Sequence, residues 1–466
     1  MLPTPFAIFV AIAAWRANDE SILSTFMLFC LFGATAAFTL PSLGNAPVTP
    51  AVAMVPVLVW RALSGRDIND AMPHLAPGRA GFWLLLLFVW GAATAVLMPR
   101  FFAGETYVFS TSRSSDFLGV NRSLLAPNST NITQTAYLAL ALIVFIAVSL
   151  LLEGKGRAEK FAMAVGTLGV ANAIVAVLGL MEFEFGVVGP VALLKNGAYA
   201  VFDNYEIGGL VRITGAFSES SAFAGFTMPL LAFVGSLWRS GFKRQMTGPL
   251  ALLLLALLLF STSTTAYVAL VAYTVFLALT AAWQGIVPGR QPLVLGWGTA
   301  LCGASVAAAC LALLLAPEAF ATVWQFLDAV VMRKLETESG VERSSWNAQA
   351  WLNTMDTRGL GAGLGSVRAS SFPFVLVSNV GFLGAGLFLA FVVRAAVPPG
   401  GPVDGDVAIT RLAARHAMLA ALIAASLAAA VFDLGPTFYA FAAAAAMPAL
   451  APISEAAKER LRRATG

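Results

Sequence analysis

Two oppositely charged side chains and several hydroxyls precede an apolar stretch in RITGAFSESSAFAG, residues 212–225. The Arg212 guanidinium stays charged and binds phosphate oxygens through a planar two-point fork. Glu219, seven residues later, is the best candidate for the general base of a group-transfer reaction. Ser218 and Ser220 flank Glu219 and are candidates for contacts with a hydroxylated substrate. The alternative is that Glu219 only pairs with Arg212 and holds the loop in place.

A second polar stretch, VERSSWNAQAWLNTMDTRGLGAGLGSVR at 341–368, carries three arginines and a glycine-rich run. Glycine-rich backbone can turn its N–H groups toward an anion, and arginines bind phosphate or pyrophosphate. The candidate ligands of such an anion are Arg343, Arg358, Gly361, Gly363 and Arg368. Each arginine alone has an alternative, a snorkelling or lipid-headgroup contact. The glycines follow no strand and open no βαβ unit, which argues against a nucleotide site.

A third group of hydroxyls, STSTT at 261–265, lies between two apolar segments. Ser263 and Thr264 are candidates for contacts with a sugar. The alternative is that these hydroxyls only cap the ends of helices, as serine and threonine often do.

The sequence offers no set of metal ligands. The cysteines Cys30, Cys302 and Cys310 all lie inside apolar runs, with no metal-binding spacing. The two histidines, His74 and His416, are far apart and cannot anchor a Cys/His site. No cluster of acids suits Mg²⁺. We therefore expect neither a metal nor another cofactor.

The elements that must position these residues belong in a membrane. Hydrophobic residues make up 59% of the chain, charged residues 11%, and the mean hydropathy is +0.82. Soluble domains carry about 25% charged residues, so the composition excludes them. We predict one all-α polytopic transmembrane domain, 1–466, with about 12 or 13 crossings. The expected helices are 4–15, 23–40, 47–63, 81–98, 134–152, 161–181, 222–238, 248–262, 265–283, 293–316, 373–393, 412–431 and 437–452.

The distribution of lysine and arginine predicts the orientation of these helices. When the helices alternate, the basic segments fall on one side, which is predicted to be cytoplasmic together with the C-terminus. These segments are 61–80, 153–160, 239–245, the chain around Arg290, 394–415 and 458–463. The loops 99–133, 182–221 and 317–372 then face outward, and the last two are the large ones. Within the third loop, 320–335 has the spacing of an amphipathic helix, either on the membrane surface or packed on the other loops.

Four stretches of the chain, in the same order, resemble the motifs of the O-antigen ligase and polymerase superfamily, the Wzy-like membrane glycosyltransferases. They are RITGAFSESSAFAG (212–225), TSTTAYVAL (262–270), ERSSWNAQAWLNTMDTRGLGAGLGS (342–366) and SNVGFLGAGLF (378–388). The resemblance covers the catalytic-core region, 134–394. It implies that the family's functional arginines correspond to Arg212 and Arg343, and that Trp346 belongs to the substrate-binding outer loop.

This resemblance implies a polymerase of the bacterial inner membrane. The enzyme would join undecaprenyl-pyrophosphate-linked oligosaccharide repeat units at the outer face of the bilayer, without a metal. Its partners would be that lipid-linked oligosaccharide, the bilayer, and the flippase and chain-length regulator of the same pathway, with no nucleic acid. Glu219 in SESS leans toward an exopolysaccharide or capsule polymerase, because related members carry glutamate there.

The resemblance has one departure, and other functions remain open. Ser370 and Ser371 stand where many members carry His-Asn, and this departure weakens the alternative hypothesis of a ligase-type transfer to another acceptor. A lipid-linked oligosaccharide transporter is the chief rival, although its sites would be expected near mid-membrane and in repeated halves. A non-catalytic scaffold in a polysaccharide export complex is the third alternative.

Overall fold

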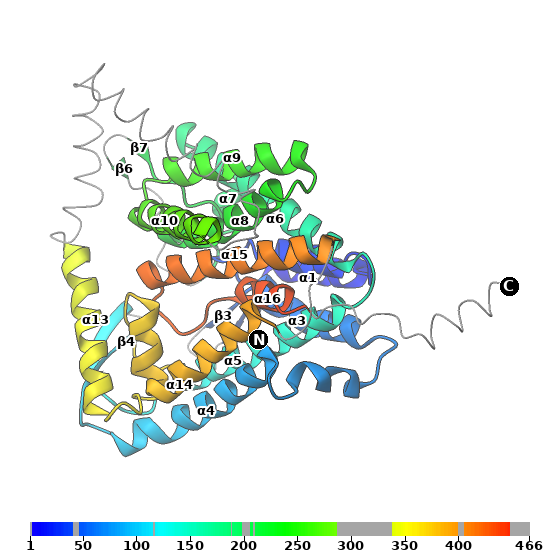
Figure 1. Ribbon diagram of the computed structural model, residues 1–466. Coiled ribbons are helices and arrows are strands. Elements are labelled where there is room, and N and C mark those ends of the chain that lie inside the picture. The colour runs from blue at the N-terminus through cyan, green and yellow to red at the C-terminus, as the bar shows by residue number, and fades with distance from the viewer. Residues whose placement is uncertain are drawn as a thin grey trace.

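Long helices dominate the computed structural model, as the composition predicts (Figure 1). The structure describes residues 2–40, 46–114, 117–187, 189–197, 206–207, 210–286, 338–398 and 405–447. Within these ranges, seven helices are long and apolar enough to cross a membrane. They are α4 (Ala80–Phe101), α5 (Ser129–Leu151), α6 (Arg157–Glu184), α8 (Ser220–Arg239), α10 (Thr264–Ile286), α14 (Phe372–Ala396) and α15 (Gly405–Ala428). The chain is therefore a multi-pass helical membrane protein.

Shorter elements fill the space between these helices. The other helices are α1 (Pro5–Arg16), α2 (Ile22–Phe29), α3 (Pro50–Leu63), the 3-10 helix η2 (Ile68–Leu75), α7 (Pro190–Leu193), α9 (Arg244–Phe260), α13 (Glu338–Asp356) and α16 (Pro436–Ala445). The strands form three short antiparallel sheets. The first has three strands, β1 (Leu2–Pro3), β2 (Phe38–Leu40) and β3 (Ala46–Val48). The other two are two-stranded and pair β4 (Tyr107–Ser114) with β5 (Phe117–Leu124) and β6 (Glu206–Ile207) with β7 (Leu210–Val211).

The described residues contain fewer full-length spans than the expected 12 or 13. Three further apolar helices, α1, α3 and α9, have 12, 14 and 17 residues and fall short of the spanning length. The helix expected at 437–452 is α16, which ends at Ala445 after ten residues. The helix expected at 293–316 and the amphipathic helix expected at 320–335 lie outside the described residues.

The helix expected at 23–40 is wrong over most of its length. Only α2 is helical there, and the chain then runs irregularly into β2. The reason is tertiary hydrogen bonding: Ala34 N donates to Ala216 O at 3.2 Å, and Ala36 N donates to the Asn196 side chain at 2.7 Å. Because backbone groups must be satisfied in an apolar setting, these loop partners replace the helical ladder. An apolar sequence alone does not reveal such partners.

Two of the expected outward loops contain regular structure that the sequence analysis missed. Within 99–133, β4 and β5 form a hairpin in which Tyr107 pairs with Leu124. Its serine-rich sequence lacks the apolar alternation of a half-buried strand, so it resembles a loop. Within 317–372, α13 carries the polar stretch that begins at Val341, and it packs against β4 and α14.

The polar loops gather at two ends of the helix bundle. At the site end, the segments that meet are 104–131, 212–221 and 343–379. Asn353 donates to Tyr107 O at 2.6 Å, and Asn131 donates to Leu364 O at 2.8 Å. At the basic end, the segments that meet are 17–20, 61–81, 153–160 and 239–244. There Lys243 pairs with Glu159 at 2.9 Å. Each of α4, α5, α6, α8 and α14 runs from one of these ends to the other.

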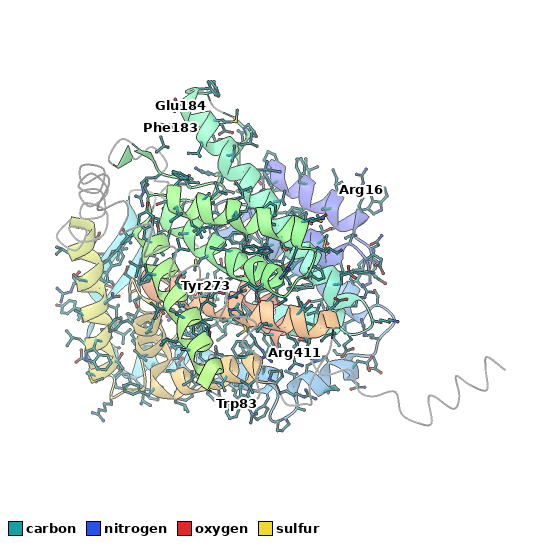
Figure 2. All side chains as sticks on the ribbon, turned by 45° about the horizontal axis from the view of Figure 1, so that its top comes forward. Arg16, Trp83, Phe183, Glu184, Tyr273 and Arg411 are labelled. Carbon is teal, nitrogen blue, oxygen red and sulfur yellow. The ribbon has the colours of Figure 1, made fainter. Side chains whose placement is uncertain are left out.

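The apolar core between the two ends is built from aromatic and small side chains. Phe161 of α6, Phe233 of α8 and Phe441 of α16 are all buried, with ring centroids 5.6–6.4 Å apart. Figure 2 labels Tyr273 on α10, whose hydroxyl lies 2.9 Å from His416 Nδ1 of α15. This hydrogen bond ties α10 to α15.

Candidate functional site

Glu219 lies at the site end, immediately before the first turn of α8. Its backbone is extended and it occupies the N-cap position, where a negative charge is favoured by the helix dipole. Its carboxylate accepts a hydrogen bond from Ser221 Oγ at 2.5 Å. The preceding turn needs Gly215, whose φ of +52° is left-handed and which lies against the Phe223 ring.

Arg343 of α13 is the ion-pair partner that the structure gives Glu219. Arg343 Nη2 lies 3.7 Å from Glu219 Oε2, and the two side chains are 32% and 34% exposed. The pair joins two polar stretches that are more than a hundred residues apart in the chain. At this distance and exposure it is a loose pair of about 0–1 kcal/mol. An anionic or hydroxylated ligand could therefore displace either partner.

The other expected residues of the first stretch lie beside this pair in the chain. Arg212 and Ser218 are both half-buried. Ser220 is buried at the start of α8, and its hydroxyl has no hydrogen-bond partner in the part of the chain that the structure describes. Lys195 donates to Thr214 Oγ1 at 2.9 Å and so ties the preceding loop to this turn.

Trp346 and Arg368 form a second contact at the site end. The Arg368 guanidinium carbon lies 5.4 Å from the centroid of the Trp346 ring, within the range of a cation–π interaction. The Trp346 ring is only 9% exposed and packs against Phe109 of β4 at 6.2 Å. Arg368 N also donates to Phe109 O at 2.8 Å. Trp346 is thus a buried platform that positions Arg368, rather than an open stacking surface.

The glycine-rich loop, residues 359–366, packs directly on α14 where that helix is broken. Gly381 has φ +68° and ψ −175°, which is not helical. A Cβ on Gly361 would lie 2.6 Å from Gly381 N, and a Cβ on Gly363 would lie 2.7 Å from Thr94 O. Both glycines also have positive φ. The loop and α14 can approach so closely only because side chains are absent here.

The N–H groups of this loop are used by protein acceptors. Ala362 N donates to Ser378 O at 2.7 Å, and Gly363 N donates to Asn379 O at 3.0 Å. The side chain of Asn379 accepts from Gly365 N at 2.8 Å. The observed hydrogen bonds of the loop therefore attach it to α14. A direct contact of Gly361 or Gly363 with substrate stays a prediction.

The remaining expected residues are more scattered. Arg358 lies two residues after the end of α13, has φ +55° and is exposed. Ser263 is buried before α10, and its hydroxyl makes no hydrogen bond within the described residues, so it does not act as a helix cap. Thr264 begins α10 and is half-buried. The ion pair brings Arg343 to Glu219, and the stacking contact brings Trp346 to Arg368.

Several polar residues of the site end were missed by the sequence analysis. Asn131, Asn353 and Asn379 are buried amides that connect the glycine-rich loop, the hairpin and α14. Gln134 and Tyr137 of α5 line a cleft beside Arg368. The available signal was Asn379, a lone amide in the apolar sequence of α14, because a buried amide needs hydrogen-bond partners.

Within the described part of the chain, no three His, Cys, Asp or Glu side chains lie close enough together to hold a metal ion. The charged groups shown to meet at the site end are one carboxylate, Glu219, and one guanidinium, Arg343. They are able to bind an anion, orient a hydroxyl and accept a proton.

Comparisons with known proteins add no further assignment. No protein-family model, curated protein or solved structure matches this chain. The resemblance to the O-antigen ligase and polymerase superfamily therefore rests on its motifs alone, and the structure establishes a multi-pass helical membrane protein.

Proposed function

We propose that this protein is a membrane glycosyltransferase that polymerises oligosaccharide repeat units carried on undecaprenyl pyrophosphate. The observation that supports it best is the ion pair of Arg343 with Glu219. Sequence motifs marked both residues separately, and the fold brings them within 3.7 Å of each other. A cation for a pyrophosphate and a carboxylate for a hydroxyl are the two groups that this transfer needs.

The reaction uses these groups in a single displacement. The oxygen of an acceptor sugar hydroxyl bonds to the anomeric carbon of the donor, and the bond from that carbon to the pyrophosphate oxygen breaks. Glu219 takes the proton of the attacking hydroxyl. Arg343 and Arg212 stabilise the negative charge of the departing undecaprenyl pyrophosphate through charge-assisted hydrogen bonds. Ser218, Ser220 and Arg358 would complete the substrate contacts.

The proposal includes an orientation for the bundle. The basic end faces the cytoplasm of a bacterial inner membrane, in keeping with the lysine and arginine bias, and the site end faces outward. A cysteine-free protein carrying Ser344→Cys on α13 should then react with an impermeant maleimide from outside, whereas Lys155→Cys should not. Both positions are exposed. The opposite labelling pattern would remove the site from the face where the donor is presented.

The direct test is polymerisation by the purified protein. Reconstituted with lipid-linked repeat units, the wild type should produce a ladder of longer lipid-linked products. Glu219→Gln keeps the shape and the Ser221 contact but cannot take a proton, so transfer should slow by about 10²–10⁴. Ser345→Ala on the exposed face of α13 is the matched control and should behave as wild type. A transporter or scaffold would give no ladder with any variant.

A further inference from the structure

The site end also contains a polar cleft, and neither Glu219 nor Arg343 is among the residues that line it. It opens between α5, the glycine-rich loop and residues 431–432. The side chains that line it include Thr133, Gln134 and Tyr137 of α5, together with Arg368. None of the three α5 residues belongs to the motifs that carry the proposed function. The cleft is therefore a feature of the fold that the motifs do not explain.

Gln134 has an amide oxygen that nothing in the described structure satisfies. Gln134 Oε1 is buried and has no hydrogen-bond partner among the described residues. A buried amide oxygen without a donor is unfavourable and requires a partner, which can be a water or a bound ligand. The neighbouring Thr135 differs, since its hydroxyl donates to Asn131 O at 2.7 Å within its own helix. A bound hydroxyl group would supply the donor that Gln134 lacks.

The walls of the cleft are rigid and chemically mixed. Asn379, which also lines it, makes hydrogen bonds to Gly365 N and to Val367 O, both at 2.8 Å. One side carries hydroxyl and amide groups, Phe432 adds an apolar ring, and Arg368 is fixed over Trp346. A saccharide has the matching surface, with hydroxyls around its edge and C–H groups on its faces.

We propose that this cleft is the saccharide subsite for the acceptor chain, with Gln134 accepting a hydrogen bond from a sugar hydroxyl. The identification of the bound sugar as the acceptor rests on the proposed polymerase function. The binding of a saccharide by the cleft does not. Gln134 binds and orients the sugar, and takes no part in proton transfer.

The test measures saccharide binding directly, without catalysis. The probe is the set of soluble oligosaccharides released by mild acid from the lipid-linked pool of the producing cell. Binding to the full chain in lipid nanodiscs is followed by saturation-transfer NMR. Gln134→Leu keeps the size but removes the acceptor, so affinity should fall about tenfold, as expected for one lost hydrogen bond. Thr135→Val is the matched control and should bind as wild type. Equal melting temperatures would show that both variants are folded.

The outcomes separate this inference from the proposed function. Equal binding by wild type and Gln134→Leu, or no binding by either, would overturn the cleft assignment even if the polymerisation ladder forms. Binding that depends on Gln134 without any ladder would retain the saccharide site and overturn the polymerase. If both hold, Gln134→Leu should raise KM for a soluble acceptor about tenfold and leave kcat unchanged.

Discussion

The two ends of the helix bundle hold their loops together by different means. The basic end uses ion pairs between partly exposed side chains, such as Lys243 with Glu159 at 2.9 Å and Arg157 with Glu20 at 3.8 Å. The site end uses buried amides, above all Asn379 and Asn131, which bond to the backbone of the glycine-rich loop. Only one ion pair, Arg343 with Glu219 at 3.7 Å, is found there among the described residues.

This difference distinguishes the residues that hold the loops in place from the residues that are available to a ligand. Exposed ion pairs contribute little to stability and tolerate substitution, whereas a buried amide that loses its partners leaves several polar groups unsatisfied. The site end thus has a frame of buried amides around the loose pair of Glu219 and Arg343. Such an arrangement suits groups that must exchange a protein partner for a substrate.

The largest effect should follow the loss of Arg343. Under the proposed function, Arg343→Ala removes a charge-assisted contact to the leaving group, so the rate of ladder formation should fall about 10²–10³, or 3–4 kcal/mol. Arg343→Lys should restore little, because lysine lacks the planar two-point fork. The measurement is initial rate in reconstituted vesicles, at matched protein levels. Near-normal polymer from the alanine variant would reduce Arg343 to a headgroup contact.

The next effect is on stability at the site end. Asn379→Ala removes a side chain that bonds to Gly365 N, Val367 O and Val375 O, each at 2.8 Å. These buried groups lose their partner, at a cost of about 3 kcal/mol in free energy of unfolding. Thermal unfolding in detergent should show a lower Tm than wild type. An unchanged Tm would mean that the glycine-rich loop is held by other contacts.

A smaller effect should appear as a pH dependence. Burial raises the pKa of Asp433, between α15 and α16, to about 6, and the hydrogen bond from Gly435 N partly opposes this shift. Because the folded pKa lies above the unfolded value, stability is full at low pH and is lost as pH rises through about 6. Asp433→Asn should remove this loss, so its free energy of unfolding at pH 8 should exceed that of wild type by about 1–2 kcal/mol and its Tm should be higher. Parallel Tm profiles from pH 4 to 8 would contradict it.

The smallest effect is expected at the basic end. Lys243→Ala breaks the pair with Glu159, in which both side chains are about two-fifths exposed. The free energy of unfolding should change by about 0–1 kcal/mol, and transfer activity should be unaffected. A Tm loss as large as that of Asn379→Ala would erase the contrast between the two ends.

The sequence predicts a multi-pass helical membrane protein, and it locates the charged stretches between the apolar segments. It also indicates Glu219 and Arg343 as candidate functional residues, because a charged side chain next to an apolar segment is unfavourable without a functional or structural partner. It does not predict that α2 stops early, because Ala34 and Ala36 are satisfied by loop atoms far along the chain. Nor does it predict the role of the glycine-rich loop, because that depends on the break at Gly381 in another helix.

The residues of the cleft were missed for a related reason. Gln134 lies in the first part of an apolar helix, and its sequence neighbours give no sign of Arg368 or Phe432 beside it. Local patterns identify faces of helices, whereas a site between α5, a loop and the 431–432 segment depends on how the helices pack. The hairpin of β4 and β5 was missed because its pairing is supported by α13 and not by an apolar alternation.

The central claim is that Glu219 and Arg343, from two distant stretches, act in one transfer site. A double-variant cycle tests it most directly: initial ladder-forming rates are measured for Glu219→Gln, Arg343→Ala and the two together. Residues that act as a unit are strongly non-additive, so the double variant should be scarcely slower than the slower single variant. If the two losses instead multiply, the residues act independently and the single-site account is wrong.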